Sequence, residues 1–152
     1  MALPKLDRLP DAQRRHAMRA VRSADTKPEM VVRRMVHGLG RRYRLHAKAL
    51  PGNPDLTFAR DRRVIFVHGC FWHGHDCPRG ARTPKTNRAY WTAKIARNVS
   101  RDAAALSALA ALGWEARIVW ECETRDAAAL RRRLAAFLNV ASDASASRHD
   151  AD

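Results

Sequence analysis

The sequence contains no apolar run long enough to span a bilayer, and its N-terminus, MALPKLDRLPDAQRRHAM, lacks the apolar core of a signal peptide. Its 3 cysteines are an odd number, which argues against a disulfide framework and favours thiol or metal chemistry in a reducing compartment. Internal repeats and interdomain linkers are also absent from the 152 residues. We therefore expect a soluble cytoplasmic protein with one folded domain.

Acidic residues are scarce, because 15 Asp and Glu stand against 29 Lys and Arg, a formal net charge of +14. Most of the basic residues are arginines, whose planar guanidinium suits phosphate oxygens. A polyanion such as nucleic acid is the favoured partner. The alternative is a protein that is merely basic and soluble.

The pattern of apolar residues predicts an α/β fold, a mixed sheet with helices packed against it. Residues 1–14 are expected to form a flexible arm, 15–140 a single domain and 141–152 a disordered tail of small polar residues. Within the domain, helices are expected over 24–40, 87–113 and 125–140, and strands over 54–58, 63–69 and 116–121. Thr26 and Glu29 fit a capping box at the start of the first helix, with Pro28 in its first turn.

The segment HGCFWHGHDC, residues 68–77, concentrates potential metal ligands directly after the apolar run VIFV. Thiolates and imidazoles are the ligands that Zn²⁺ prefers, and Cys70 and Cys77 flank two histidines here. Cys122, at the end of the expected third strand, is the candidate fourth ligand. Spacing alone leaves open whether His73 or His75 completes the site, and whether the three thiols are related at all.

Asp55 stands at the head of an expected strand, where aspartate is an unfavourable residue. If residues 60–62 form a three-residue hairpin loop, Asp55 faces Val67 across the ladder. A carboxylate and a backbone carbonyl would then converge beside His68 and His73, and oxygen ligands suit Mg²⁺. Ordinary turn chemistry at Pro-Asp is the alternative.

Aromatic residues lie next to these candidate ligands. Phe71 and Trp72 can act as wedges between base pairs, or can simply be core residues. Trp91, Lys94 and Asn98 follow one helical stripe and would suit a nucleic-acid face. Trp114 and Trp120, which flank and end an apolar strand, are expected to be core residues.

Several longer motifs together resemble the very short patch repair endonucleases. They are MRAVRSADTKPE, YRLHAKALPGNPDLTF, VIFVHGCFWHGHDC, W-x-x-K-I-x-x-N at 91–98 and LGWEARIVWEC, and they cover about residues 14–123 in order. The resemblance implies the restriction-endonuclease-like fold with a structural zinc site. It also implies an enzyme that nicks one DNA strand 5′ to the thymine of a T:G mismatch left by deamination of 5-methylcytosine.

The resemblance also implies roles for individual residues. Asp55 and the Val67 carbonyl would bind the catalytic magnesium, which is expected to comprise two ions. The family often has threonine at the position of Val67. His73 would activate the attacking water, with His68 as its partner near the scissile phosphate. Glu29 would hold metal-bound water, a role compatible with helix capping.

For zinc, the resemblance selects His75 over His73, as the ligand that joins Cys70, Cys77 and Cys122 around one ion. The residues implied for DNA binding are Phe71, Trp72 and Trp91 from the major groove, Met18 from the minor groove, and Lys94 and Asn98 near the mismatched pair.

The implied partner is double-stranded DNA with a T:G mismatch, with a functional link to a DNA cytosine-5 methyltransferase. Mismatch-repair proteins are further candidate partners, and a monomer is expected. The rival hypotheses are a zinc-stabilised DNA-binding module without catalysis, a restriction-type nuclease of the same fold, and an RNA target.

Overall fold

The computed structural model describes residues 26–82 and 84–140. The expected arm 1–14, the tail 141–152 and Met18 lie outside the described residues. The elements are α2 (Lys27–Gly38), β1 (Arg44–Leu45), β2 (Leu56–Phe58), β3 (Arg63–His68), α3 (Arg88–Ala111), β4 (Glu115–Trp120), the 3₁₀ helix η2 (Glu121–Arg125) and α4 (Ala127–Phe137).

The four strands form one mixed sheet in the order β1-β2-β3-β4. The first three strands pair antiparallel, whereas β3 and β4 run parallel and α3 connects them. A parallel pair needs such a crossover because the chain must return to the starting edge of the sheet. The predicted mixed sheet with flanking helices is therefore confirmed.

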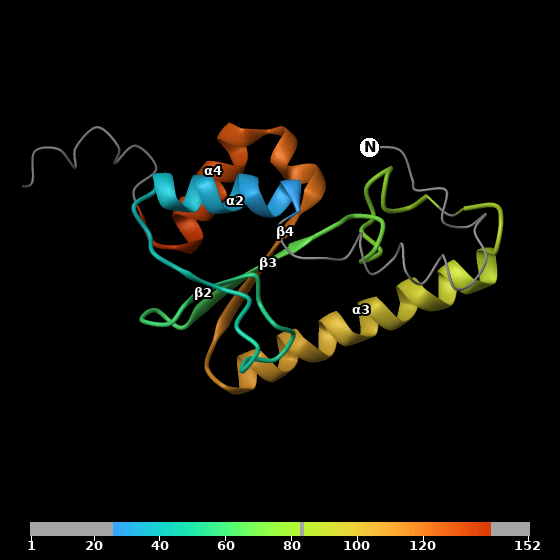
Figure 1. The fold of residues 1–152 in the computed structure, drawn as a ribbon, viewed down its shortest axis with the longest axis horizontal. Coiled ribbons are helices and arrows are strands. Elements are labelled where there is room, and N and C mark those ends of the chain that lie inside the picture. Colours follow the sequence, from blue (N-terminus) through green and yellow to red (C-terminus); the bar gives the residue numbers. More distant parts are fainter. Residues whose placement is uncertain (1–25, 83, 141–152) are drawn as a thin grey trace, which may run out of the picture.

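Helices cover both faces of the sheet, with α2 and α4 on one side and α3 on the other (Figure 1). In β3, Ile65 belongs to the main core with residues of α2 and α4, whereas Val64 and Phe66 pack with Leu109 of α3. Successive side chains of a strand point to opposite faces, so a strand covered on both faces is apolar throughout. Burial on both faces therefore explains why the run VIFV is apolar throughout.

The first helix begins as predicted. Thr26 is the N-cap residue of α2, its hydroxyl accepts a hydrogen bond from the Glu29 N–H at 3.4 Å, and Pro28 lies in the first turn. The cap places Glu29 in the first turn of α2. This N-terminal end of the helix is the end nearer to the last residues of β3 (Figure 1).

Two sequence predictions are wrong. The hairpin joining β2 and β3 pairs Leu56 with Ile65, so its register differs by one residue from the predicted pairing of Asp55 with Val67. The reason is a four-residue loop, in which Arg62 donates to the Ala59 carbonyl at 3.4 Å and has φ of 55°. Trp120, predicted as core, is only half-buried and stacks on His75 at 4.2 Å between ring centroids.

Candidate functional site

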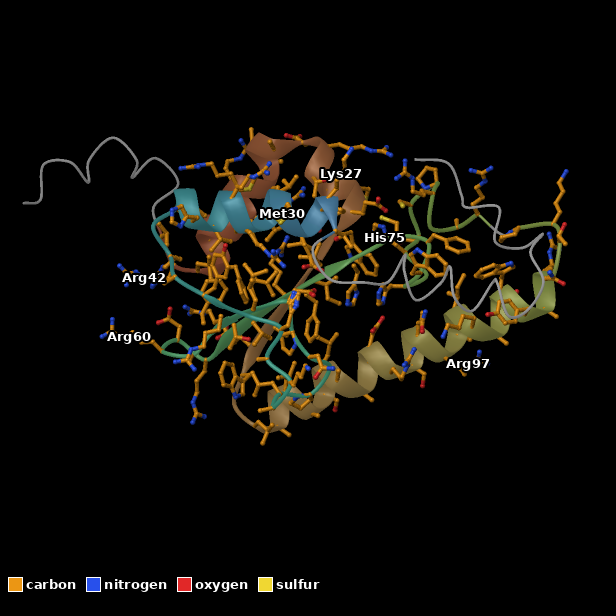
Figure 2. The ribbon with its side chains drawn as sticks, in the orientation of Figure 1. Lys27, Met30, Arg42, Arg60, His75 and Arg97 are labelled. Atoms are coloured by element: carbon orange, nitrogen blue, oxygen red, sulfur yellow. The ribbon has the colours of Figure 1, made fainter. Side chains whose placement is uncertain are left out.

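Four potential zinc ligands converge beyond the ends of β3 and β4. One ligand atom from each of Cys70, His75, Cys77 and Cys122 lies within 4.8 Å of the others. The sheet register explains the meeting, because His68 pairs with Trp120 and the two cysteines follow two residues later on each strand. In Figure 2, Arg42 and Arg60 lie at the left of the view, and His75 lies well away from them, right of centre.

The geometry of this cluster fits a tetrahedral zinc ion. The Cys122 Sγ lies 3.6 Å from the His75 Nδ1. Zinc bonds of about 2.3 Å to sulfur and about 2.0 Å to nitrogen, at the tetrahedral angle, place those two atoms about 3.5 Å apart. All three cysteines are free thiols. His75 therefore stands in the cluster as the sequence resemblance implied, whereas His73 lies in a different group.

The thiols differ in how readily they ionise. Burial raises the pKa of Cys70 to about 12 and also raises that of Cys122. For Cys77, burial is outweighed by hydrogen bonds from the Gly80 N–H and from His75, which lower its pKa to about 7. Since zinc binds thiolates, occupation of the cluster must release protons, and its zinc affinity should fall as the pH is lowered.

Gly80 is the residue on which the shape of this loop depends. A Cβ at position 80 would lie 2.0 Å from the His75 carbonyl oxygen and 2.9 Å from that of Cys70, and both atoms belong to the backbone of the cluster. Gly80→Ala should therefore lower the free energy of unfolding by about 2 kcal/mol or more, because the loop itself must move.

The measurement is thermal unfolding together with zinc content per chain. Gly38→Ala is the matched control, because its Cβ would meet only the Arg131 side chain at an ordinary 3.7 Å. Its effect should stay within about 1 kcal/mol. Equal losses in the two variants would contradict the special role of Gly80.

Asp55 directly precedes the short strand β2, which lies between β1 and β3 in the sheet. Its Oδ2 accepts a hydrogen bond of 2.6 Å from the Val67 N–H. Its own carbonyl accepts one of 3.2 Å from the His46 N–H. Asp55 and Val67 are thus in contact as predicted. The contact is a hydrogen bond to the Asp55 side chain, because the two residues are not paired across the β2–β3 ladder.

The carboxyl group of Asp55 lies within 4.8 Å of that of Glu29, whose side chain is buried. Burial raises the pKa of Asp55 to about 7, and the Glu29 carboxylate adds to the rise while the Val67 N–H and Arg33 oppose it. Two carboxyl groups this close are easily accommodated only with a proton or a cation between them. Their oxygen atoms are donors that suit a hard divalent cation.

The second group at the site is a pair of histidines with an aspartate. The rings of His68 and His73 stack, with centroids 3.8 Å apart and planes 7° from parallel. The His73 Nδ1 lies 2.7 Å from the Asp102 Oδ2, and the His68 Nδ1 lies 4.0 Å from the same oxygen. Burial lowers the pKa of His68 to about 4, with His73 adding to the effect. His68 is therefore uncharged at neutral pH.

The predicted DNA-contacting aromatics form a cluster of their own. Phe71 and Trp91 are 5% and 2% exposed, and Trp72 is the more accessible member, with ring centroids 5.0–5.7 Å apart. Asn98 is buried, and its amide donates to the Trp72 carbonyl at 2.7 Å. Asn98 thus fixes the backbone of the loop that carries Phe71 and Trp72. Lys94 is half-buried on the same helix as Asn98. DNA contact by these residues stays a prediction.

One groove of about 1190 Å³ collects most of these groups. The residues that line it include Glu29, Asp55, Val67, His68, His73, Asp102, Phe71 and Trp72. Carboxylates, imidazoles and aromatic rings from α2, the sheet and α3 therefore face one space, next to the cysteine cluster.

Comparison with known proteins identifies the family. Residues 6–79 match the family model described as DNA mismatch endonuclease Vsr. The chain is 50% identical over 133 residues to a type II nicking enzyme, V.XorIIP, of Xanthomonas oryzae pv. oryzae, covering 88% of this chain and 97% of the relative. This chain belongs to the Vsr family. It is also 42% identical over 114 residues to the DNA mismatch endonuclease Vsr of Escherichia coli, 75% of this chain and 72% of that one.

A third Vsr-family relative is the type II nicking enzyme V.NmeAIP of Neisseria meningitidis, 38% identical over 133 residues, 88% of this chain and 94% of that protein. Family membership makes the protein a DNA endonuclease. Across residues 26–82 and 84–140, the structure contains no helix with the length and apolarity that a membrane crossing requires.

Two residues of this Vsr-family site escaped the sequence analysis. Asp102 follows Asn98 by one helical turn, so extending the stripe of Trp91 and Asn98 would have found it. His46 had no such signal, because β1 is only two residues long and lies in a segment that the sequence marks as an irregular connection.

Proposed function

We propose that this Vsr-family endonuclease nicks one strand of duplex DNA on the 5′ side of the thymine in a T:G mismatch. The observation that carries the proposal is the single groove in which Asp55 and Glu29 face the histidine pair and Asp102. The names of the relatives support it, since one is called a DNA mismatch endonuclease and others are called nicking enzymes. Mismatches of this kind arise by deamination of 5-methylcytosine, which would link the enzyme to a cytosine-5 methyltransferase.

Asp55 and the Val67 carbonyl would hold the two magnesium ions of the reaction, and Glu29 would hold water bound to the metal. The paired carboxyl groups fit this role, because they are oxygen donors whose like charges require a counter-charge. The chemistry that Mg²⁺ supplies in such a site is stabilisation of charge on the phosphate and on the leaving 3′ oxygen. The cysteine cluster, in contrast, would hold one zinc ion that keeps the loop in shape.

His73 is the proposed general base. Its Nδ1 is engaged by the Asp102 carboxylate at 2.7 Å, so its Nε2 is the ring nitrogen that can accept a proton from water. His68 would lie near the scissile phosphate as an uncharged partner, because its lowered pKa keeps it from carrying a proton at neutral pH. Asp102 acts as a positioning residue that fixes the tautomer and orientation of His73.

The aromatic cluster would open the duplex at the mismatch. Trp72 is its most accessible ring, and the rings of Phe71 and Trp91 pack edge-on against it. A T:G pair is poorly stacked, so inserting a wedge there costs less than in matched DNA. The excess of basic residues would supply affinity that is independent of sequence and falls with salt.

Asp102→Asn should lower kcat for nicking about 100-fold, because an amide can donate to the His73 Nδ1 and so favour the wrong tautomer. The KM for DNA should change little. Steady-state kinetics on a T:G duplex give both values. Asp61→Asn, which alters only a half-exposed ion pair with Arg41, is the control. A kcat equal to that of the control would remove Asp102 from the mechanism.

The proposed function is tested by a strand-specific assay on end-labelled duplexes that carry one T:G pair in varied sequence contexts. Each duplex runs beside its C:G control, with Mg²⁺ and with EDTA. We expect a single Mg²⁺-dependent nick just 5′ of the mismatched thymine. Cleavage of both strands at matched sites would indicate a restriction-type nuclease, and binding without cleavage would indicate a zinc-stabilised DNA-binding module. Preferential competition by an RNA duplex would point to an RNA target.

A further inference from the structure

Glu29 is held in place by Arg33 and His46, two residues that have no role in the chemistry proposed above. The Arg33 Nη2 lies 2.8 Å from the Glu29 Oε2, one helical turn along α2. The same Nη2 lies 3.2 Å from the Nε2 of His46, which comes from the segment after β1. The side chains of Arg33 and Glu29 are only 11% and 7% exposed, so this contact is shielded from water.

We propose that Arg33 and His46 are positioning residues that hold the Glu29 carboxylate against Asp55. This inference rests on the proposed function, in which these carboxylates serve DNA cleavage. Arg33 supplies the positive charge that allows a buried Glu29 to lie beside a second carboxyl group. His46 contacts the same Nη2 at 3.2 Å and so restricts the movement of the guanidinium.

The backbone places His46 in this position. The pairing of Leu45 with Leu56 puts His46 opposite Asp55, and the His46 N–H donates to the Asp55 carbonyl at 3.2 Å. His46 has φ of 50°, a left-handed conformation that costs a side-chain-bearing residue on the order of 1 kcal/mol. The surrounding structure must therefore favour this conformation, which places the His46 ring against Arg33.

A metal ion shared by Glu29, His46 and Asp55 is the competing interpretation, because their ligand atoms lie within 4.8 Å of one another. The Arg33 guanidinium argues against it. Its Nη2 lies in contact with both Glu29 and the His46 Nε2, so the lone pair that a metal would use accepts a hydrogen bond from Arg33. Arg33 can only donate, so its contact with the His46 Nε2 is a hydrogen bond when the ring proton is on Nδ1, whereas a proton on Nε2 would face the Glu29 Oε2, 3.4 Å away.

The tautomer of His46 gives a test that does not require catalysis. ¹⁵N NMR of the zinc-loaded protein without added Mg²⁺ reports which ring nitrogen of His46 is protonated. We expect the proton on Nδ1 in the wild type and a shift away from that tautomer in Arg33→Met. A His46 protonated on Nε2 in the wild type would overturn the inference.

The kinetic test compares neighbouring arginines of α2. Arg33→Met should lower kcat for nicking about ten-fold with KM for DNA within about two-fold, whereas exposed Arg34→Met should leave both values within about two-fold. His46→Ala should lower kcat about five-fold, and His46→Gln, whose amide oxygen can accept from Arg33, should recover most of it. Loss of kcat in His46→Gln equal to that in His46→Ala would overturn the inference.

A double-variant cycle separates positioning from general support of the fold. If Arg33 acts through Glu29, the Glu29→Gln/Arg33→Met protein should lose no more activity than the more damaged single variant. Additive losses would overturn the inference. Failure of the wild type to nick any T:G duplex would instead overturn the proposed function, while the tautomer measurement still decides the contact of Arg33 with His46.

Discussion

Asp55→Asn should abolish detectable nicking of a T:G duplex while leaving its binding intact. The carboxylate is the negatively charged ligand that a divalent cation needs at this site, and an amide is a poor substitute. Losing about 4 kcal/mol of charge stabilisation in the transition state slows cleavage about 1,000-fold. Asparagine can still accept the hydrogen bond from the Val67 N–H, so the loop should keep its shape.

The same substitution should stabilise the metal-free protein at neutral pH. The pKa of Asp55 is about 7 in the fold against 3.8 for the free side chain, so the folded state binds more protons between those values. The free energy of unfolding therefore falls as the pH rises from about 4 to 7. Asp55→Asn should remove this loss and raise Tm at pH 7 for the zinc-loaded protein without Mg²⁺.

Three measurements decide the outcome for Asp55: single-turnover nicking, binding of the T:G duplex without Mg²⁺, and thermal unfolding across pH. Asp61→Asn is the matched control, because Asp61 makes only a half-exposed ion pair at 3.3 Å from Arg41. Nicking by Asp55→Asn at the rate of this control would show that Asp55 is no metal ligand. Lost binding would show that it holds structure instead.

Cys77→Ala should release zinc and destabilise the whole chain. The cluster joins the loop after β3 to the segment after β4, and structural zinc supplies on the order of 10 kcal/mol to folding. Even a loss of about 4 kcal/mol would lower Tm by roughly 10 °C in a domain of this size. Because the loop also carries Trp72 and His73, nicking should be lost together with the zinc.

Metal analysis and thermal unfolding of Cys77→Ala measure this effect, beside wild-type protein treated with a strong chelator. Wild-type protein should bind one zinc per chain, lose stability on chelation and regain it when zinc is restored. The variant should regain nothing. A zinc-free Cys77→Ala protein that is stable and active would refute the structural-metal interpretation.

Much of this protein could be predicted from local patterns. The start of α2 follows from Thr26 and Pro28, whose preferences act within one helical turn. The three long helices and the strands around VIFV follow from their apolar periodicity. The cysteine cluster follows from ligand chemistry and spacing, but the selection of His75 over His73 needed the family resemblance or the structure.

Other features depend on contacts between distant segments. The hairpin register was predicted wrongly, because it depends on whether three or four residues form the loop, and the residue types of ARDR permit either. Trp120 was predicted as core because it ends an apolar strand, yet its ring contacts His68 at the end of β3 and stacks on His75 of the cysteine cluster.

The sequence by itself therefore determined the three long helices, the strands β2, β3 and β4, and a list of candidate metal-binding and catalytic residues. Only the tertiary structure decided how they are supported: Asp102 of α3 orients His73, and His46 beside β1 holds Arg33 and through it Glu29. The reason is physical. Propensity and ligand chemistry act over a few residues, whereas these supporting contacts join residues 13 and 29 positions apart and exist only once the sheet and helices are packed.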